Sequence, residues 1–391
     1  MRILRSIHSV NPAGGGPIEG IKQVARIHAA EGHETEIISL DGRRDACVIE
    51  CPLKVHAMGP VCNSYGYSGK FVPWLRKHRS EYNAVIVSGL WQYNSFAVWR
   101  ALCGSGTPYF VFPHGMLDPW FKRRYFFKHW KKWAYWPWAD YRVLRDAAGV
   151  LFTSSEERRS SRDSFWLYHC REIVVKYGVA GPSAQPDVQK VKFAERFPDL
   201  AGKRFLLFLG RLHEKKGCDL LLKAYAEILP SLNSELQLVV AGPDQVGSIG
   251  KLKELASRLR ISRHVLWAGM VSGDVKWGML RSAEAFVLPS HQENFGISVA
   301  EALSCGTPVL ISNKVNIWRE IERDQAGLVE GDDMEGTVQL LRRWTELTPS
   351  ERAAMAIASR RCFESRYEIA RAAEDLLELL TASSNTMLTK K

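Results

Sequence analysis

Four charged residues in the second half of the chain have types and spacings that suit a ligand that is part polyol and part anion. Glu293 and Glu301 are separated by seven residues, and Arg211 and Lys216 by four. Carboxylates accept hydrogen bonds from sugar hydroxyls, and the two cations supply positive charge at a fixed spacing. The backbone N–H groups of residues 294–296 stand before a predicted helix, so they offer an anion site at its N-terminus.

Predicted strands come directly before these charged residues. The apolar run 285–288 precedes the loop with Glu293, and the run 205–209 precedes Arg211. Residues 297–303 then have a helical pattern. In open α/β sheets, ligands bind at the carboxyl ends of the strands. The sequence therefore predicts one ligand site at such an edge.

Two stretches of this region resemble the signature of the retaining glycosyltransferases of family 4, which have the GT-B fold. They are ENFGISVAEALSCGTPV, from Glu293 to Val309, and GRLHEKKG, from Gly210 to Gly217. The resemblance implies that Arg211 and Lys216 grip the diphosphate of a nucleotide-sugar donor. It also implies that Glu293 orients the sugar hydroxyls, that Glu301 binds the ribose, and that the backbone of residues 269–271 meets the nucleobase.

The first half opens with a predicted strand–helix–strand unit whose first loop is glycine-rich. Dinucleotide binding would need G-x-G-x-x-G in this loop, and the motif is missing, which argues against an NAD-dependent oxidoreductase. In the family, the loop frames donor and acceptor, a role that falls on Gly14, Gly15 and Gly16. The stretch 113–120, PHGMLDPW, resembles an acceptor-side loop of the family in which the histidine, here His114, approaches the transferred sugar.

The expected site therefore has three groups of residues. The catalytic group is His114, Arg211, Lys216 and Glu293. The donor-binding group is Gly15, Gly16, Gly210, Gly269, Met270, Asn294, Phe295, Gly296, Ile297 and Glu301. Trp91 and Asp118 form a weaker acceptor-side group, because an aspartate before proline is also a common turn residue. We expect no metal site and no cofactor, since the cations and helix amides can stabilise the leaving phosphate, and no D-x-D stands at a strand end in a suitable context.

Residues 120–145 combine eight basic with eleven aromatic side chains. Such a mixture suits an anionic membrane interface, which is the interpretation we favour. Three alternatives stay open: a core helix with a solvated basic face, a stacking surface for single-stranded nucleic acid, and the lining of an acceptor sugar site. No RNA- or DNA-binding motif accompanies the stretch, so we expect no nucleic-acid partner.

The chain has 391 residues and a formal net charge of +11. This length suits two domains, and the charge suits anionic partners. We expect an N-terminal Rossmann-like domain at 1–180, a linker at 181–202, a nucleotide-sugar domain at 203–365, and a helix with a polar tail returning at 366–391. The predicted fold is thus GT-B, with two parallel sheets facing across a cleft. The hinge departs from the family at Lys176–Tyr177–Gly178, where Pro-Asn-Gly is common.

The eight cysteines are scattered, and no apolar run is long enough to span a bilayer. We expect a cytoplasmic enzyme, peripheral on the inner face of the cell membrane. Its predicted activity is sugar transfer to a glycan or lipid-linked acceptor in the synthesis of cell-surface polysaccharide or lipopolysaccharide. Rival interpretations are a nucleotide-sugar epimerase, a phosphorylase of the same architecture, and an inactive binding subunit.

Overall fold

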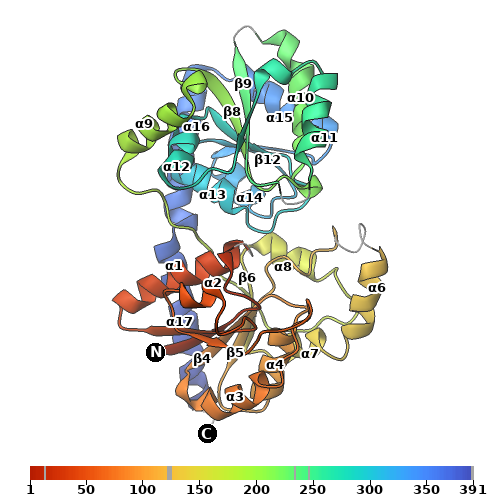
Figure 1. Cartoon of the computed structure of the whole chain (residues 1–391), viewed down its shortest axis with the longest axis vertical. Coiled ribbons are helices and arrows are strands. Elements are labelled where there is room, and N and C mark those ends of the chain that lie inside the picture. Colours follow the sequence, from red (N-terminus) through yellow and green to blue (C-terminus); the bar gives the residue numbers. More distant parts are fainter. Residues whose placement is uncertain (13–14, 121–125, 233–234, 245–246, 389–391) are drawn as a thin grey trace. The chain divides into compact units, whose positions relative to one another are not determined.

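The protein is described by a computed structural model that covers residues 1–12, 15–120, 126–232, 235–244 and 247–388. It has two compact units. Unit 1 comprises 1–178 and 369–391, and unit 2 comprises 179–368. Each unit is a parallel sheet with helices on both faces (Figure 1).

The sheet of unit 1 has seven parallel strands in the order β3-β2-β1-β4-β5-β6-β7. From β1 the sheet grows in one direction through β2 and β3, and from β4 it grows in the other through β5, β6 and β7. The strand order therefore reverses between β1 and β4. The strands are β1 (Arg2–Ser6), β2 (Glu34–Ser39), β3 (Val55–Ala57), β4 (Ala84–Ser88), β5 (Tyr109–Phe112), β6 (Gly149–Phe152) and β7 (Glu172–Val174).

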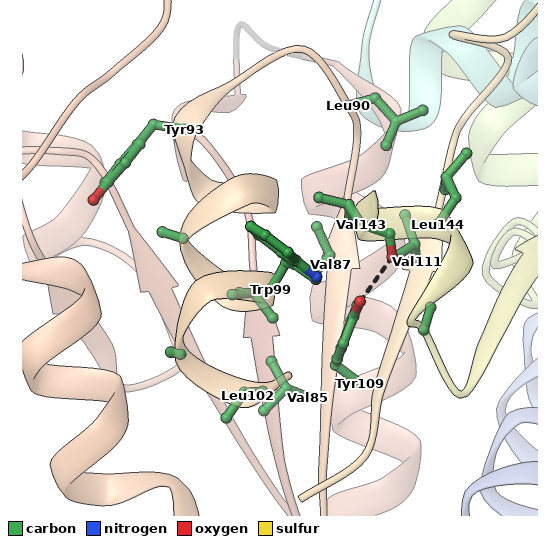
Figure 2. Packing of buried hydrophobic residues seen from close by; sticks show 14 of the residues in the cluster. Val85, Val87, Leu90, Tyr93, Trp99, Leu102, Tyr109, Val111, Val143 and Leu144 are labelled. Carbon is green, nitrogen blue, oxygen red and sulfur yellow. Dashed lines mark hydrogen bonds between the residues drawn. The ribbon is translucent and has the colours of Figure 1, made fainter. Parts of the chain in front are cut away.

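Both faces of this sheet are covered, which explains why its strands are continuous apolar runs. One face packs against α3 (Phe71–His78), α4 (Tyr93–Leu102) and α7 (Asp140–Arg145). Figure 2 shows this core, in which Trp99 and Leu102 of α4 lie over Val85 and Val87 of β4. The hydroxyl of Tyr109, the first residue of β5, donates to the carbonyl oxygen of Val143 at 2.8 Å. This buried hydroxyl therefore has a hydrogen-bond partner.

The opposite face of unit 1 is closed by the last helix, α17 (Ile369–Leu388), drawn in blue among red and orange elements in Figure 1. Its Leu376 and Leu380 are buried with Ile3 and Phe110 of the sheet. The other helices of the unit are α1 (Gly16–Ala30), α2 (Ala46–Ile49), α6 (Phe126–Tyr135) and α8 (Ser155–Ser161).

Unit 2 has a six-stranded parallel sheet in the order β10-β9-β8-β11-β12-β13. Its topology reverses between β8 and β11. The strands are β8 (Arg204–Leu209), β9 (Leu236–Ala241), β10 (Val265–Gly269), β11 (Ala285–Leu288), β12 (Val309–Ser312) and β13 (Gly327–Glu330). The helices are α9 (Pro186–Arg196), α10 (Cys218–Ile228), α11 (Ile249–Arg258), α12 (Gly273–Ser282), α13 (Ile297–Ser304), α14 (Trp318–Arg323), α15 (Met334–Glu346) and α16 (Pro349–Cys362).

One expected boundary needs correction. The range 181–202, expected to be a linker, contains α9, which packs against α12 inside unit 2. α8 is capped by Ser154, whose side chain accepts from the backbone N–H of Glu157. Between α16 and α17 the chain forms a π-helical turn at Phe363–Tyr367 and then one extended residue, Glu368.

Candidate active site

Lys216 and Glu293 come together in unit 2 at the reversal between β8 and β11. Lys216 ends a short 3₁₀ turn, Glu214–Lys216, which follows β8, and Glu293 lies in the loop after β11. Their side chains form an ion pair between Nζ and Oε2. In doubly wound sheets this reversal is where ligands bind. The two residues, 77 positions apart in the chain, thus meet where a ligand site was predicted.

Hydrogen bonds to one backbone carbonyl hold together the two loops that carry this pair. The carbonyl oxygen of Lys215 accepts from the N–H of His291 and from the hydroxyl of Ser290, both at 2.7 Å. Gly217 has a φ of 68°, and a Cβ there would lie 2.1 Å from the carbonyl oxygen of Pro289. Only glycine fits this close approach, so the loop–loop contact explains the glycine after Lys216.

The Lys216 ammonium is held in a largely enclosed site, with the residue only 9% exposed. Burial, and then the positive charges of Lys215 and Arg211, lower the pKa of Lys216 to about 7. The carboxylate of Glu293 acts in the opposite direction, because an anion in contact stabilises the charged ammonium. Arg211 is itself exposed. The arrangement offers two cations to an incoming anion, one of them already oriented by a carboxylate.

Backbone contacts with the β12 side hold Glu293. Its N–H donates to the carbonyl oxygen of Lys314, and its own carbonyl oxygen accepts from the N–H of Asn316, both at 3.0 Å. The next residues lead into α13. Gly296 caps this helix with a φ of 76°, and Phe295 is buried with its ring edge against Tyr367, 5.6 Å between centroids. The N–H groups of Ile297 and Ser298 come before the first hydrogen bond of this helix turn, which Val299 donates to the carbonyl oxygen of Gly296 at 2.9 Å.

Glu301 lies one turn further along α13 and pairs with a residue that the sequence did not single out. Its Oε1 lies 2.8 Å from Nζ of Lys276 on α12, and that ammonium lies 4.1 Å from the ring centroid of Trp277. A lone lysine on a predicted helix gives no sequence signal for such a role. Glu301 is therefore separately anchored and is not part of the Lys216–Glu293 pair.

Three glycines line up where β8, β9 and β10 end. Gly210 donates its N–H to the carbonyl oxygen of Ala241 at 3.0 Å, and Gly242 donates to that of Gly269 at 2.7 Å. A Cβ on Gly242 would lie 1.9 Å from the carbonyl oxygen of Gly210. The three glycines therefore present backbone atoms and no side chain at this edge of the sheet. The neighbouring Met270 is 77% exposed. Gly210 and Gly269 belong to the donor-binding group that was predicted from the sequence.

Unit 1 has a cavity of about 240 Å³ at its own reversal, between β1 and β4. It contains the predicted Gly15 and His114, together with His8 and Gln92, which the sequence did not single out. The full lining is Ile7, His8, Ser9, Gly15, Pro17, Ile18, Ser88, Gly89, Gln92, His114 and Met116. Gly16 begins α1 directly after this wall, and Gly14 lies outside the described residues.

His114 is held in an unusual conformation, with a φ of 50° and its ring stacked on Phe112 at 5.4 Å. Burial, and then the positive charge of Arg5, lower its pKa to about 3, so the imidazole is neutral at pH 7. The loop is fixed by Glu157 of α8. This buried carboxylate accepts from the N–H of Gly115 and from the N–H and hydroxyl of Thr153, each at 2.7 Å.

The two weaker acceptor-side candidates, Trp91 and Asp118, do not line this cavity. Asp118 accepts from the N–H of Trp120 at 2.8 Å, which closes a local turn, and it does not line the cavity. Trp91 has a φ of 67° and donates its backbone N–H to the buried carboxylate of Asp140 at 3.1 Å. The Lys132 ammonium lies 4.5 Å from the Trp91 ring centroid. Trp91 thus belongs to a packed cluster next to Gln92 rather than to the cavity wall.

Within 120–145, residues 121–125 lie outside the described structure, and the rest divides between core and surface. Trp136 is fully buried and stacks on Phe165 at 4.2 Å. Four other tryptophans are exposed large side chains, and we call them the tryptophan surface: Trp130, Trp133, Trp138 and Trp166. Trp166 comes from outside the predicted stretch but lies 6.4 Å from Trp133, ring to ring.

Within the described residues, no helix combines the length and apolar character needed to cross a membrane. Over the same residues, no group of three or more His, Cys, Asp or Glu side chains is arranged to hold a metal ion.

Two family models match consecutive parts of the chain. Residues 15–178 match the one described as glycosyl transferase 4-like domain, and residues 191–361 the one described as glycosyl transferases group 1. A D-inositol 3-phosphate glycosyltransferase of Geodermatophilus obscurus is 31% identical over 198 residues, covering 49% of this chain and 44% of that protein. The chain thus spans less than half the length of this relative.

Solved structures resemble the whole chain at lower identity. Sucrose-phosphate synthase of Thermosynechococcus elongatus gives a TM-score of 0.76 at 18% identity, covering 98% of this chain and 99% of that one. HepE of Anabaena, solved in complex with UDP and glucose, gives 0.74 at 16% identity, covering 98% and 100%. These similarities confirm the predicted fold class.

Proposed function

Since the chain belongs to the glycosyltransferases with the GT-B fold, we propose that it moves a sugar from a nucleoside-diphosphate sugar to a glycan or lipid-linked acceptor, with retention of configuration. The observation that carries this proposal is the contact of Lys216 with Glu293 at the strand-order reversal of unit 2. HepE, which has a similar fold, was solved with UDP and with UDP-glucose, which supports a nucleotide-sugar as the donor.

The donor diphosphate is the natural ligand for the cations of unit 2. Lys216 and Arg211 neutralise the phosphates, and the N–H groups at the start of α13 add donors without charge. When phosphate takes over Lys216, Glu293 is released to accept hydrogen bonds from the sugar hydroxyls. Glu301, held by Lys276, is placed to bind the ribose, and the bare backbone at Gly210 and Gly269 lets the nucleotide approach closely.

Cleavage of the sugar–phosphate bond places negative charge on the leaving diphosphate. Lys216 and Arg211 stabilise that charge as it develops, and we propose that they do so without a metal ion. For retention, the acceptor hydroxyl attacks from the face that the diphosphate leaves. Its proton passes to a phosphate oxygen while the C–O bond to the phosphate breaks and the new glycosidic bond forms.

The acceptor is proposed to bind at the 240 Å³ cavity of unit 1. Its wall has the uncharged hydrogen-bonding groups of His8, Gln92 and the neutral His114, and its described residues include no Asp, Glu, Lys or Arg. Such a wall suits sugar hydroxyls better than a phosphate. The tryptophan surface, with the exposed Lys131 on the same helix as Trp130, suits the interface of an anionic membrane, where a lipid-linked acceptor for cell-surface polysaccharide is found.

Product analysis tests this function directly. The protein is incubated with a panel of labelled nucleotide-sugars, each with and without polyprenyl-linked or free glycan acceptors. A transferase releases nucleoside diphosphate and yields a longer glycan whose new linkage keeps the anomeric configuration of the donor. An epimerase would convert the donor with no acceptor present, and a phosphorylase would need free phosphate. Either of those patterns would overturn the proposal.

A further inference from the structure

Arg5, in the middle of β1, is a buried cation that lacks a counter-charge. The residue is 7% exposed. Across the described residues, its guanidinium makes no hydrogen bond and no ion pair, and its Nε is buried with no partner. The guanidinium carbon lies 5.6 Å from the centroid of the Phe112 ring. Moving a cation from water into such a place costs several kcal/mol unless an anion accompanies it.

Arg5 lines two small, partly open spaces behind the sheet, under α1 and α17. They have volumes of about 20 and 10 Å³. Neither is lined by an aspartate or a glutamate. Burial lowers the pKa of Arg5 to about 10, so it remains charged at neutral pH. Among the described residues, the lining of these two spaces thus supplies no carboxylate to balance the charge of Arg5.

Other polar groups converge on the larger space. His114 lines it, and the Nε2 of this histidine is buried with no hydrogen bond. Tyr177 lines it as well, with its hydroxyl next to Gly20, where a Cβ would lie 2.9 Å from the phenolic oxygen. An imidazole and a phenol can each donate one hydrogen bond. The larger space is thus lined by two cationic side chains, those of Arg5 and Lys176, and by an imidazole and a phenol.

We propose that this space binds one small monovalent anion of the halide class, held by Arg5 with His114 as an additional donor. A volume of about 20 Å³ holds a single water-sized particle, so phosphate and carboxylic acids are too large. A water molecule would fit but would leave the charge unbalanced. Because His114 also lines the 240 Å³ cavity, the anion would fix the ring that forms part of the acceptor wall.

The first test compares thermal unfolding in sodium chloride, sodium bromide and sodium gluconate at equal ionic strength. We expect the halides to raise the melting temperature saturably, by about 3 °C at ten times the dissociation constant, relative to gluconate. Arg5→Met fills a similar volume without charge and should lose this halide increment. Arg26→Met, an exposed arginine on α1, should keep it. Equal melting temperatures in all three salts, or an unchanged increment in Arg5→Met, would overturn the proposal.

A second measurement does not depend on the variant folding. Crystals of the wild-type protein grown or soaked in bromide should show an anomalous peak beside the Arg5 guanidinium, absent from crystals kept in gluconate. A water molecule there, with no anomalous peak at high bromide, would contradict the proposal even if halides shifted the melting temperature. Both measurements report anion binding alone. Their outcome therefore does not depend on whether the protein transfers sugar.

Discussion

Glu301 of α13 and Lys276 of α12 form an ion pair whose Oε1 and Nζ atoms lie 2.8 Å apart. The lysine fixes the carboxylate that we propose binds the donor ribose. Lys276→Met should therefore raise the donor KM by about tenfold, roughly the worth of one charge-assisted hydrogen bond, with a smaller change in kcat. Lys251→Met, an exposed lysine on α11, serves as the matched control. Steady-state kinetics with varied donor measure this, and an unchanged KM would show that Lys276 does not position Glu301.

Lys216 is expected to act mainly in the transition state. Lys216→Ala removes a charge stabiliser of the leaving diphosphate and should lower kcat/KM by roughly two or more powers of ten. Lys223→Ala, on the adjacent helix α10 and paired only locally with Asp219, should leave it unchanged. Both variants are assayed with and without a metal chelator. Near-normal turnover of Lys216→Ala, or complete loss of wild-type activity on chelation, would argue against the metal-free scheme.

The tryptophan surface should control membrane association. Changing Trp130, Trp138 and Trp166 together to Ser should sharply reduce flotation with vesicles that contain anionic lipid, and Lys131→Glu should do so more weakly. The control changes Val191 and Ile357, exposed apolar residues of unit 2, to Ser. If the wild-type protein and this triple variant float equally, the tryptophan surface has another role.

Glu157 is predicted to be important for stability as well as for the His114 loop. Glu157→Ala leaves the donors of Gly115 and Thr153 without an acceptor in the interior, and should cost about 3 kcal/mol of unfolding free energy. Arg159→Ala, exposed on the same helix, should cost little. Denaturant unfolding measures both. A loss below about 1 kcal/mol for Glu157→Ala would show that the loop is held by other contacts.

Glu36 of β2 should make stability dependent on acid pH. Its carboxylate, 2% exposed, accepts from Arg2, Lys54, His56 and Tyr82. Burial alone would raise the pKa of Glu36, but these donors together lower it. A depressed pKa in the folded state gives stability that is present above the unfolded pKa and is lost as pH falls below it.

The measurement for Glu36 is the unfolding free energy from pH 7 down to pH 3. Glu36→Gln should be less stable by about 3 kcal/mol at pH 7, and the difference from wild type should shrink as the pH falls. Glu34→Gln, on the same strand with a side chain 55% exposed, is the control. A difference that stays constant with pH would contradict a charge-based role.

Residues that act next to a strand end were predictable from the sequence, because local pattern determines their position. Lys216 and Glu293 each follow a buried apolar strand, and parallel strands bring such positions to one edge. Lys276, His8 and Arg5 were not predictable as site residues, since their environments are created by elements distant in sequence. Arg5 looked like one polar residue in a short strand, and only the packing of α1 and α17 shows that it is buried.

The prediction of element boundaries was wrong where the composition of a segment was ambiguous. The segment 181–202 is polar enough to suggest a linker, because only two residues of α9, Gln189 and Phe193, are buried. Their burial is nevertheless how α9 packs into unit 2. The interruption at Phe363–Tyr367 lies in a region of continuous helical pattern. It is accompanied by two long-range contacts, the bidentate pair of Arg366 with Asp324 and the backbone bridge from Val179 to Glu368.

The return of α17 to unit 1 has a consequence for biosynthesis. Unit 2 is built from one uninterrupted stretch of chain, so all of its contacts are available once residue 368 has left the ribosome. The first 178 residues emerge much earlier, but the apolar surface around Ile3 and Phe110 stays open to water until Leu376 and Leu380 follow. The domain translated first is therefore the one completed last, and a nascent chain must protect that surface while the other domain is being made.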